Sequence, residues 1–253
     1  MIYLNPVFFL KGNHYFLESL YMLKYTSNFK KYLSLLEETI EDPKFPVNDN
    51  IASLSFLYVY NNKLNLHILE GTFAESEYLI PEILEKIKLH SEHLDEHHEM
   101  LFFYKIASIY FGNEKYNECI NYLDKIINNK NLSMREDLMC FARLLSLIAH
   151  YELGKDYYLE NHLKNTYKFL IKMNDLHEVQ KEIIKFLRNL NNFYPADIKK
   201  EFKKMHARFV ELEKNTYEKR AFLYLDIISW LESKIENRKI ADIIKEKAKL
   251  NSR

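Results

Sequence analysis

The chain has 253 residues, of which 47% are apolar and 15% aromatic, so it can bury a large core. Its 36 basic and 36 acidic side chains cancel at neutral pH and are interleaved along the sequence, which argues against a nucleic-acid binder. The four glycines never cluster, and this excludes the glycine-rich loops with which Rossmann and P-loop proteins hold phosphate groups.

The sequence also indicates the cellular compartment of the protein. The opening stretch, residues 1–23, is apolar but lacks the basic region of a signal peptide, and Asn5 and Pro6 interrupt it. No window holds the roughly 18 uninterrupted apolar residues that a membrane span needs. Cys119 and Cys140 lie in apolar helical patterns and are interpreted as buried free thiols, which suits a reducing compartment. We therefore expect a cytoplasmic protein without a membrane span.

Apolar residues recur at helical spacing along almost the whole chain, and the alternation typical of strands is hardly seen. Pro81 is expected near a helix start or at a kink, and Trp230 is interpreted as a core residue. The signals for helix starts are Asn5 with Pro6, one of the candidate caps Asn48, Asp49 and Asn50, Ser133 with Glu136, Asp175 with Glu178, and Pro195. The predicted helices cover residues 6–25, 27–41, 49–70, 73–91, 97–111, 115–129, 134–153, 157–173, 176–191, 195–214, 216–235 and 238–250.

Three glycines indicate a repeat. Gly71, Gly112 and Gly154 lie 41 and 42 residues apart, and each separates two apolar helical runs. Because a glycine after a helix adopts the left-handed conformation at low cost, the spacing predicts a repeated helix–turn–helix unit with these glycines at equivalent turns. Residues 103–123 also follow the tetratricopeptide (TPR) pattern, although its closing proline is absent. The matching residues are Phe103, Ile106, Ala107, Tyr110, Cys119 and Leu123.

Three segments carry a family resemblance: IYFGNEKYNECINYLDKI, REDLMCFARLLSLIAHYELG and TYEKRAFLYLDIISWLESKIENR. In them, over roughly residues 100–240, the chain resembles bacterial TPR-like helical-repeat proteins of unassigned function. The resemblance implies an α-solenoid with a binding role. Since such proteins often carry further helices in front, it leaves open that this chain is the C-terminal portion of a longer protein.

We therefore predict an all-α fold, a single TPR-like helical-repeat domain over residues 1–253. About six helix–turn–helix hairpins would form a degenerate TPR-like, right-handed superhelical stack, closed by a C-terminal capping helix at residues 238–250. The hairpins would complete one another's cores, because none can bury its apolar face alone.

The leading functional prediction is a non-enzymatic scaffold that binds a protein or peptide on the concave face, which the first helices of the hairpins line. Neither a cofactor nor a nucleic-acid partner is expected. Aromatic contacts would come from one repeat and basic contacts from the next. The predicted partner-binding residues are Tyr60, Lys63, His67, Tyr104, Ser108, Phe111, Arg143, Ser146, His150 and Tyr151.

Two alternatives remain open, a zinc-dependent hydrolase and a purely structural segment of a larger protein. His93, Glu96 and His97 match the H-x-x-E-H pattern of a class of zinc proteases, in which two histidines on one helix bind zinc and the glutamate acts as general base. Those enzymes have mixed α/β folds, whereas no strands are expected here. A solvated turn is therefore the favoured interpretation, and no catalytic or metal-binding residue is predicted.

Overall fold

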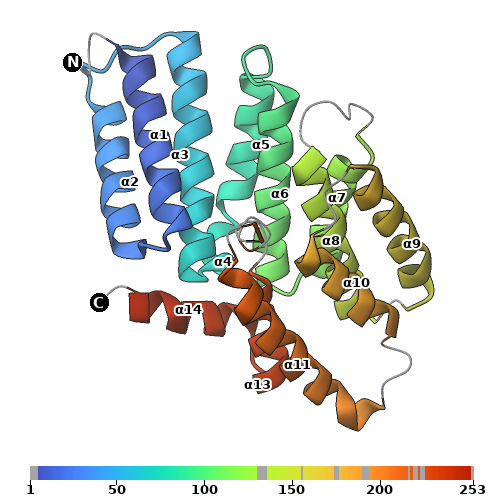
Figure 1. Cartoon of the computed structure of the whole chain (residues 1–253). Coiled ribbons are helices and arrows are strands. Elements are labelled where there is room, and N and C mark those ends of the chain that lie inside the picture. Colours follow the sequence, from blue (N-terminus) through green and yellow to red (C-terminus); the bar gives the residue numbers. More distant parts are fainter. Residues whose placement is uncertain are drawn as a thin grey trace. The chain divides into compact units, whose positions relative to one another are not determined.

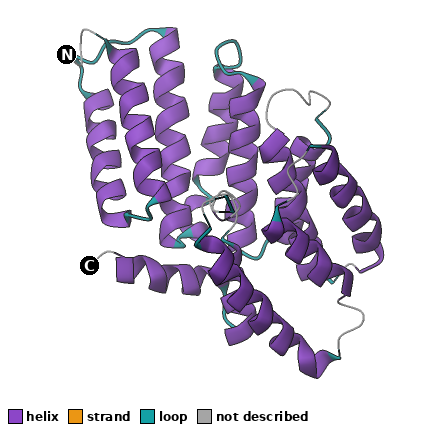
Figure 2. Cartoon of the chain, in the orientation of Figure 1, coloured by secondary structure: helices purple, strands orange, loops and turns teal. Residues whose placement is uncertain are grey.

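Among the residues that it describes, the structure is built from helices alone (Figure 2). It is a computed structural model, and it describes residues 5–129, 136–154, 156–173, 177–189, 194–215, 217–218, 222 and 226–251. Nothing in this part of the chain forms a strand, which confirms the all-α fold class. Over the same residues, no helix is at once long enough and apolar enough to pass through a lipid bilayer.

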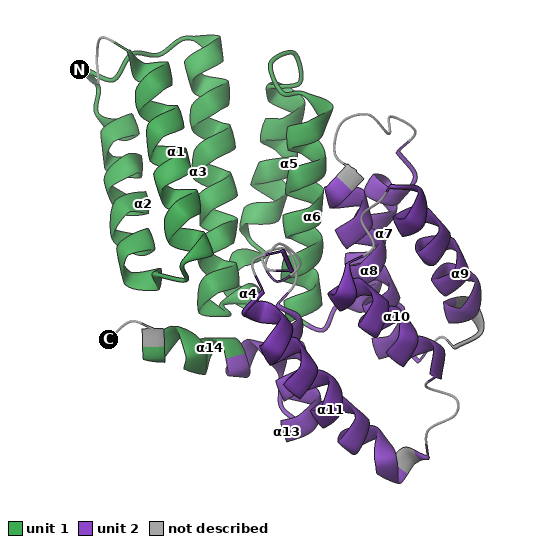
Figure 3. Cartoon of the chain, viewed as in Figure 1, with its two compact units in different colours: residues 1–113, 244–253 green, residues 114–243 purple. Residues whose placement is uncertain are grey.

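Contacts between helices divide the chain into two compact units, which Figure 3 colours separately. Unit 1 comprises residues 1–113 and 244–253, and unit 2 comprises residues 114–243. The sequence predicted one continuous array, and that continuity stays a prediction.

In unit 1, contacts join neighbouring helices as well as helices two or three places apart along the chain (Figure 1). Its helices are α1 (Pro6–Met22), α2 (Thr26–Glu41), α3 (Asp49–Glu70), α4 (Phe73–Ser76), α5 (Leu79–Leu89) and α6 (Glu96–Gly112). Helix α1 contacts both α2 and α3, and α3 contacts both α4 and α6. Helices α1, α3 and α6 therefore follow one another side by side.

In unit 2, packing follows chain order, from α7 and α8 through α9 and α10 to α11 and α13. Its helices are α7 (Tyr116–Ile127), α8 (Glu136–Glu152), α9 (Asp156–Lys172), α10 (Glu178–Asn189), α11 (Pro195–Glu213) and α13 (Ile227–Glu236). A last helix, α14 (Ile240–Asn251), contains residues of both units and corresponds to the helix predicted at residues 238–250.

Helix starts follow the local sequence signals. The side chain of Asn5 accepts a hydrogen bond from the backbone N–H three residues on, at 3.1 Å, and Pro6 is the first residue of α1. Asn48 caps α3 in the same way at 2.9 Å. Each cap satisfies a backbone donor that the helix itself leaves unpaired. The predicted caps Ser133 and Asp175 lie outside the described residues.

The helix predicted at residues 73–91 is broken into α4 and α5. Pro81 lies in the first turn of α5, as expected, where a missing N–H removes no helical hydrogen bond. A continuous helix would need that N–H to bond the carbonyl of Glu77, four residues earlier. The proline therefore favours a new start at Leu79.

The three evenly spaced glycines are not equivalent. Gly71 and Gly154 adopt positive φ angles of 67° and 64° in the turns after α3 and α8. Gly112 is instead the last residue of α6, and the left-handed residue of that turn is Glu114, at φ 60°. The predicted cap role is thus wrong for Gly112. Close packing explains this glycine, because a Cβ atom there would lie 2.4 Å from the ring of Phe73.

The turns after α1, α6 and α8 do share one geometry. In each, the left-handed residue lies two positions after the last residue of one helix and two before the first residue of the next. These residues are Lys24, Glu114 and Gly154, at φ 55°, 60° and 64°. The second helix of each pair then buries apolar side chains at the same two positions. The buried pairs are Phe29 and Leu33 in α2, Cys119 and Leu123 in α7, and Leu159 and Leu163 in α9.

Candidate functional site

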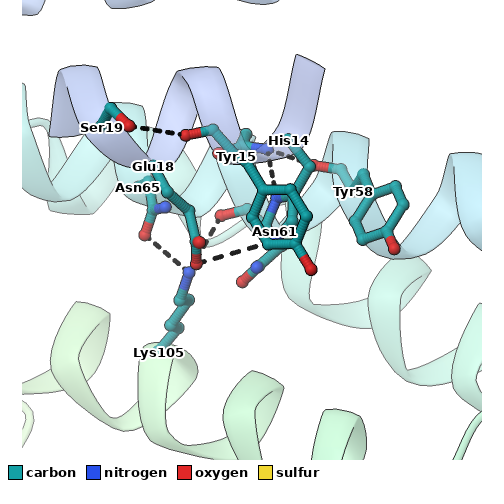
Figure 4. Close-up of polar contacts among 9 residues, drawn as sticks. His14, Tyr15, Glu18, Ser19, Tyr58, Asn61, Asn65 and Lys105 are labelled. Carbon is teal, nitrogen blue, oxygen red and sulfur yellow. Dashed lines mark hydrogen bonds and ion pairs between the residues drawn. The ribbon is translucent and has the colours of Figure 1, made fainter. Parts of the chain in front are cut away.

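A strip of asparagine side chains lies buried along one side of α3 in unit 1 (Figure 4). Asn61, Asn62 and Asn65 expose only 2%, 0% and 3% of their surface. Tyr58 continues the strip, and the His14 ring from α1 stacks on it with ring centroids 4.4 Å apart. Burying amides is costly unless they are hydrogen-bonded, so this strip needs partners. We call the following set the amide cluster: His14, Glu18, Tyr58, Asn61, Asn62, Asn65 and Lys105.

Lys105 of α6 supplies part of that bonding. Its Nζ donates to Oδ1 of Asn65 at 2.7 Å and to the backbone oxygen of Asn61 at 3.4 Å. Glu18 of α1 points toward the same ammonium group (Figure 4). The half-buried ammonium thereby ties α6 to α3.

His14 is uncharged at neutral pH. Burial lowers its pKa to about 4, and the positive charges of Lys105 and His98 act in the same direction. Its Nδ1 lies 3.4 Å from Nδ2 of Asn62, which donates, so the ring proton is on Nε2. That nitrogen faces Oε1 of Glu18 at 3.6 Å.

Two acceptors of the amide cluster are unpaired. Oδ1 of Asn61 and Oδ1 of Asn62 are buried without a hydrogen-bond partner among the described residues. Oδ1 of Asn65 differs, because Lys105 donates to it. A buried polar group left unpaired costs about 1–3 kcal/mol. Full hydrogen bonding of the cluster would therefore need two further donors.

A second polar site lies in unit 2, around Arg143 of α8. Its guanidinium carbon stands 4.2 Å from the ring centroid of Phe169 in α9, and Nη2 donates to the backbone oxygen of Ile127 at 3.4 Å. Its Nε is buried without an acceptor. Across the described part of the chain, no carboxylate forms an ion pair with this guanidinium.

Two histidines lie near Arg143. His150 donates from Nδ1 to the backbone oxygen of Ser146 at 2.8 Å, and its ring stacks on His162 with centroids 4.8 Å apart. The pKa of His162 is lowered first by burial, and His150 and Arg143 lower it further, whereas Asp124 opposes the shift. Arg143, His150, His162 and Phe169 are called the guanidinium site below. Arg143 supplies the positive charge of this set, and a positive charge attracts anions.

The residues predicted on α3 face the other way from the amide cluster. Tyr60 donates to the carboxylate of Glu82 in α5, and Lys63 pairs with Oε1 of Glu37 in α2 at 2.7 Å. Nδ1 of His67 lies 2.7 Å from a threonine hydroxyl in the turn after α3. These side chains join α3 to the helices beside it, whereas Asn61 and its neighbours face α1 and α6.

The residues predicted on α6 and α8 are mostly buried. Tyr104 and Phe111 expose 3% and 4% of their surface, and Ser108 donates to the carbonyl of Tyr104 at 3.0 Å within α6. On α8, Ser146 and His150 expose 3% and 9%. Side chains so buried stabilise the fold through packing, and a partner would reach them only after a rearrangement. Tyr151 is half-buried and packs edge-on against Trp230.

The H-x-x-E-H segment is split between a loop and a helix. His93 is exposed in the connection between α5 and α6, whereas Glu96 and His97 lie in the first turn of α6. The two histidines therefore do not share a helix face, which the zinc-protease geometry requires. Over the described residues, no three His, Cys, Asp or Glu side chains gather so as to hold a metal ion.

An open apolar hollow lies along α1 in unit 1, with a volume of about 370 Å³. Phe8 and Phe16 are 70% and 43% exposed beside it, and a side chain added at Gly12 would meet open space. Its lining residues are Asn5, Phe8, Phe9, Gly12, Asn13, Phe16 and Tyr32.

No family model, curated protein or solved structure matches this chain. Its resemblance to TPR-like repeat proteins therefore stays a prediction. The chain itself offers one polar site in each unit: an amide cluster with two unpaired acceptors, and a guanidinium without a carboxylate among the described residues.

The amide cluster was missed from the sequence, although a signal for it exists. Asn61, Asn62 and Asn65 recur at helical spacing within an otherwise apolar helix. Asparagine is a poor helix former, so three on one side of a helix need a reason other than helix formation. The residues predicted to bind a partner on this helix were Tyr60, Lys63 and His67 instead.

Proposed function

We propose that this chain is a non-enzymatic scaffold that binds a protein or peptide segment with acidic groups. The observation that carries the proposal is Arg143, a half-buried guanidinium with no carboxylate partner among the described residues. Arginine keeps its charge at physiological pH, and a buried charge is costly without a counter-ion. An acidic group of a partner would supply that counter-ion.

The proposed architecture is a TPR-like α-solenoid to which both units belong. Three features support it: the shared turns after α1, α6 and α8, the equivalent buried pairs in α2, α7 and α9, and the side-by-side packing of α1, α3 and α6. Stacked hairpins present extended surfaces on which partners bind. Function as a binding scaffold is consistent with such an arrangement.

The guanidinium site is suited to carboxylate binding. Guanidinium and carboxylate form two parallel hydrogen bonds, and hydrogen bonds to charged groups contribute about 1.5–3 kcal/mol each. Phe169 lies under the guanidinium of Arg143 and holds its orientation, so little side-chain freedom is lost on binding.

Selection from a random peptide library displayed on phage tests the proposal. We expect the purified protein to enrich peptides with Asp or Glu. Fluorescence anisotropy should then give a dissociation constant at least about tenfold weaker for Arg143→Met than for the wild type, the equivalent of losing one charge-assisted hydrogen bond. Methionine keeps the apolar stem and removes the charge.

Arg238→Met is the matched control, because Arg238 is at the surface and already pairs with Glu236 at 3.0 Å. Its affinity should equal that of the wild type. Failure to enrich any peptide, or equal binding by the Arg143 variant, would overturn the proposal.

A further inference from the structure

Helix α1 carries apolar side chains on two opposite sides. Leu10, Leu17 and Leu20 are buried in the core of unit 1. The other side is exposed, and its apolar residues recur at helical spacing from the first turn to the C-cap. A helix that is apolar all round is typically buried, so a further surface is expected to cover this side. We call the exposed set the α1 face: Phe8, Tyr15, Phe16, Met22 and Leu23, with exposed fractions of 70%, 63%, 43%, 55% and 60%.

The size of the α1 face fits a protein–protein interface. At about 200 Å² for each fully exposed side chain of this size, the exposed fractions correspond to roughly 600 Å² of surface. A stable interface of standard size buries about 800 Å² on each partner. Tyr32 of α2 also lines the apolar hollow beside α1, so α2 can supply part of the remainder. The face is therefore large enough to hold a second protein chain.

Gly12 leaves a gap in the middle of the α1 face. A glycine in a helix interior destabilises the helix relative to alanine. A side chain added at Gly12 would meet open space, so packing against the described residues does not require a glycine here. The gap instead opens into the apolar hollow of about 370 Å³. A side chain that enters this hollow from another molecule would explain the glycine.

We propose that two copies of this chain pair through the α1 face, with their α1 helices antiparallel. Gly12 and Phe16 lie about one turn apart, and both line the hollow. With a two-fold axis crossing α1 midway between them, near residue 14, Phe16 of each copy lies over Gly12 of the other and fills its hollow. A two-fold interface needs this self-complementarity, because residue i then contacts residue j and j contacts i.

The charged residues at the edge of the α1 face give nearly the same axis. Lys11 and Glu18 are the charged side chains of α1, since His14 is neutral at pH 7. They are seven residues apart and so lie on one side of the helix. An axis between residues 14 and 15 brings Lys11 of each copy opposite Glu18 of the other, whereas parallel helices would place like charges side by side. Lys11 is exposed, and the Glu18 side chain is 42% exposed. The charge pattern therefore favours a second copy as the occupant.

Sedimentation velocity of the purified protein between about 1 and 100 µM tests the pairing. We expect a reversible equilibrium between monomer and dimer. Phe16→Asp should raise the dissociation constant of the dimer at least about a hundredfold, because the substitution buries a charge in both copies. The matched control is Leu89→Lys, at a residue of α5 that is 73% exposed and outside the α1 face, and it should dimerise as the wild type does. A chain that stays monomeric at about 100 µM, or equal dimerisation by Phe16→Asp, would overturn the inference.

Gly12→Leu separates a lost interface from a damaged fold. Leucine is a better helix former than glycine and would meet open space in the free protein, so the Tm of the monomer should not fall. The same side chain would occupy the hollow that Phe16 of the other copy needs, so dimerisation should weaken at least about tenfold. If Gly12→Leu dimerises as the wild type does, the hollow lies outside the interface and the inference is wrong.

Cysteine cross-linking tests the antiparallel arrangement. Residue 15 lies next to the proposed axis, so Tyr15→Cys should form a disulfide between copies under mild oxidation, which needs Cα atoms within about 7 Å. At about 1.5 Å per residue, Phe8 of one copy would lie about 20 Å from Phe8 of the other, so Phe8→Cys should stay unlinked. The native Cys119 and Cys140 are buried and should not react. Linking through Phe8→Cys, or none through Tyr15→Cys, would overturn the antiparallel pairing.

The pairing goes beyond the proposed function and does not depend on it. Phe16 belongs to unit 1, whereas Arg143 belongs to unit 2. Arg143→Met should therefore dimerise as the wild type does, and Phe16→Asp should still enrich acidic peptides. Loss of dimerisation in Arg143→Met would place the interface at the guanidinium site and overturn the pairing through α1.

Discussion

Two buried networks, one in each unit, differ in whether their hydrogen bonding is complete. In unit 2, Glu152 exposes 7% of its side chain, accepts from Nε1 of Trp230 at 2.6 Å through Oε1, and pairs with Lys234 through Oε2. In unit 1, Asn61 and Asn62 each keep an oxygen without a partner among the described residues. Complete networks specify one packing of a core, whereas an incomplete network keeps a cost.

Unit 2 has a second complete network, at the start of α10. Glu218 is 6% exposed, and its two carboxylate oxygens accept from the backbone N–H groups of Glu178 and Val179, each at 3.2 Å. A carboxylate at a helix N-terminus also interacts favourably with the helix dipole. These two carboxylates of unit 2 thus stabilise the fold, whereas two amide oxygens of unit 1 have no partner among the described residues.

Breaking the Glu152 network should have the largest effect. Lys234→Met leaves a buried carboxylate without its counter-ion, so the free energy of unfolding should fall by about 3 kcal/mol. Urea denaturation followed by tryptophan fluorescence measures this in unit 2, because Trp230 is the only tryptophan.

Lys214→Met is the control for that substitution. Lys214 pairs with Glu211 at 2.8 Å, but both side chains are about two-thirds exposed, at 68% and 65%, so the change should be below about 0.5 kcal/mol. Equal effects of the two substitutions would mean that the Glu152 network contributes no more than a surface pair.

Acid should weaken unit 1 through His14. Its pKa is lowered from 6.5 to about 4, chiefly by burial, so the unfolded chain takes up a proton first as the pH falls. Stability from this group is fully present above about pH 6.5 and is lost toward pH 4, by up to about 3 kcal/mol. Oε1 of Glu18 lies 3.6 Å from Nε2 of the ring, and Lys105 and His98 act on the ring electrostatically, lowering its pKa.

Hydrogen exchange of α1 and α3 amides between pH 6.5 and 4, corrected for intrinsic rates, measures this loss. His14→Gln should flatten the pH dependence, because glutamine does not titrate. A slope that is unchanged in the variant would assign the acid sensitivity to other groups.

Removing the lysine of the amide cluster should cost less. Lys105→Met deprives Oδ1 of Asn65 of its donor, so a third amide oxygen becomes unpaired and stability should fall by about 2 kcal/mol. Urea denaturation followed by circular dichroism checks the value. The control is Lys245→Met, whose exposed lysine is 3.7 Å from Glu75 and should matter little. A silent Lys105→Met would show that the bond to Asn65 contributes nothing.

Helices could be predicted from this sequence because their determinants are local. Apolar spacing, Asn5 before Pro6 and the cap Asn48 involve residues a few positions apart, and the structure confirms them. Pro81 marked the start of α5, yet the break between α4 and α5 was missed. The role of Gly112 could not be predicted, because the ring that requires it belongs to Phe73, 39 residues earlier.

The candidate site was harder to predict for the same reason. Lys63 and Asn61 are both polar residues of α3, and only their contacts with other helices distinguish them. Lys105, about 40 residues later, donates to the backbone oxygen of Asn61 and to Oδ1 of Asn65. Burial of a polar side chain depends on tertiary packing, so spacing alone could not single out the asparagines.

The smallest expected effect tests the second complete network of unit 2. Glu218→Gln keeps the size of the side chain and one acceptor oxygen, but it removes the charge and turns an NH2 group toward a backbone N–H of α10. The interaction of the charge with the helix dipole contributes about 0.3–1 kcal/mol. The free energy of unfolding, measured by Trp230 fluorescence, should therefore fall by about 1 kcal/mol. Glu211→Gln, at an exposed pair, is the control and should shift by less. If the free energy of unfolding falls as much as in Lys234→Met, Glu218 stabilises the core of unit 2 as strongly as the Glu152 network does. An unchanged free energy of unfolding would mean that water replaces the carboxylate at no cost. The hydrogen bonds of Glu218 would then contribute nothing to stability.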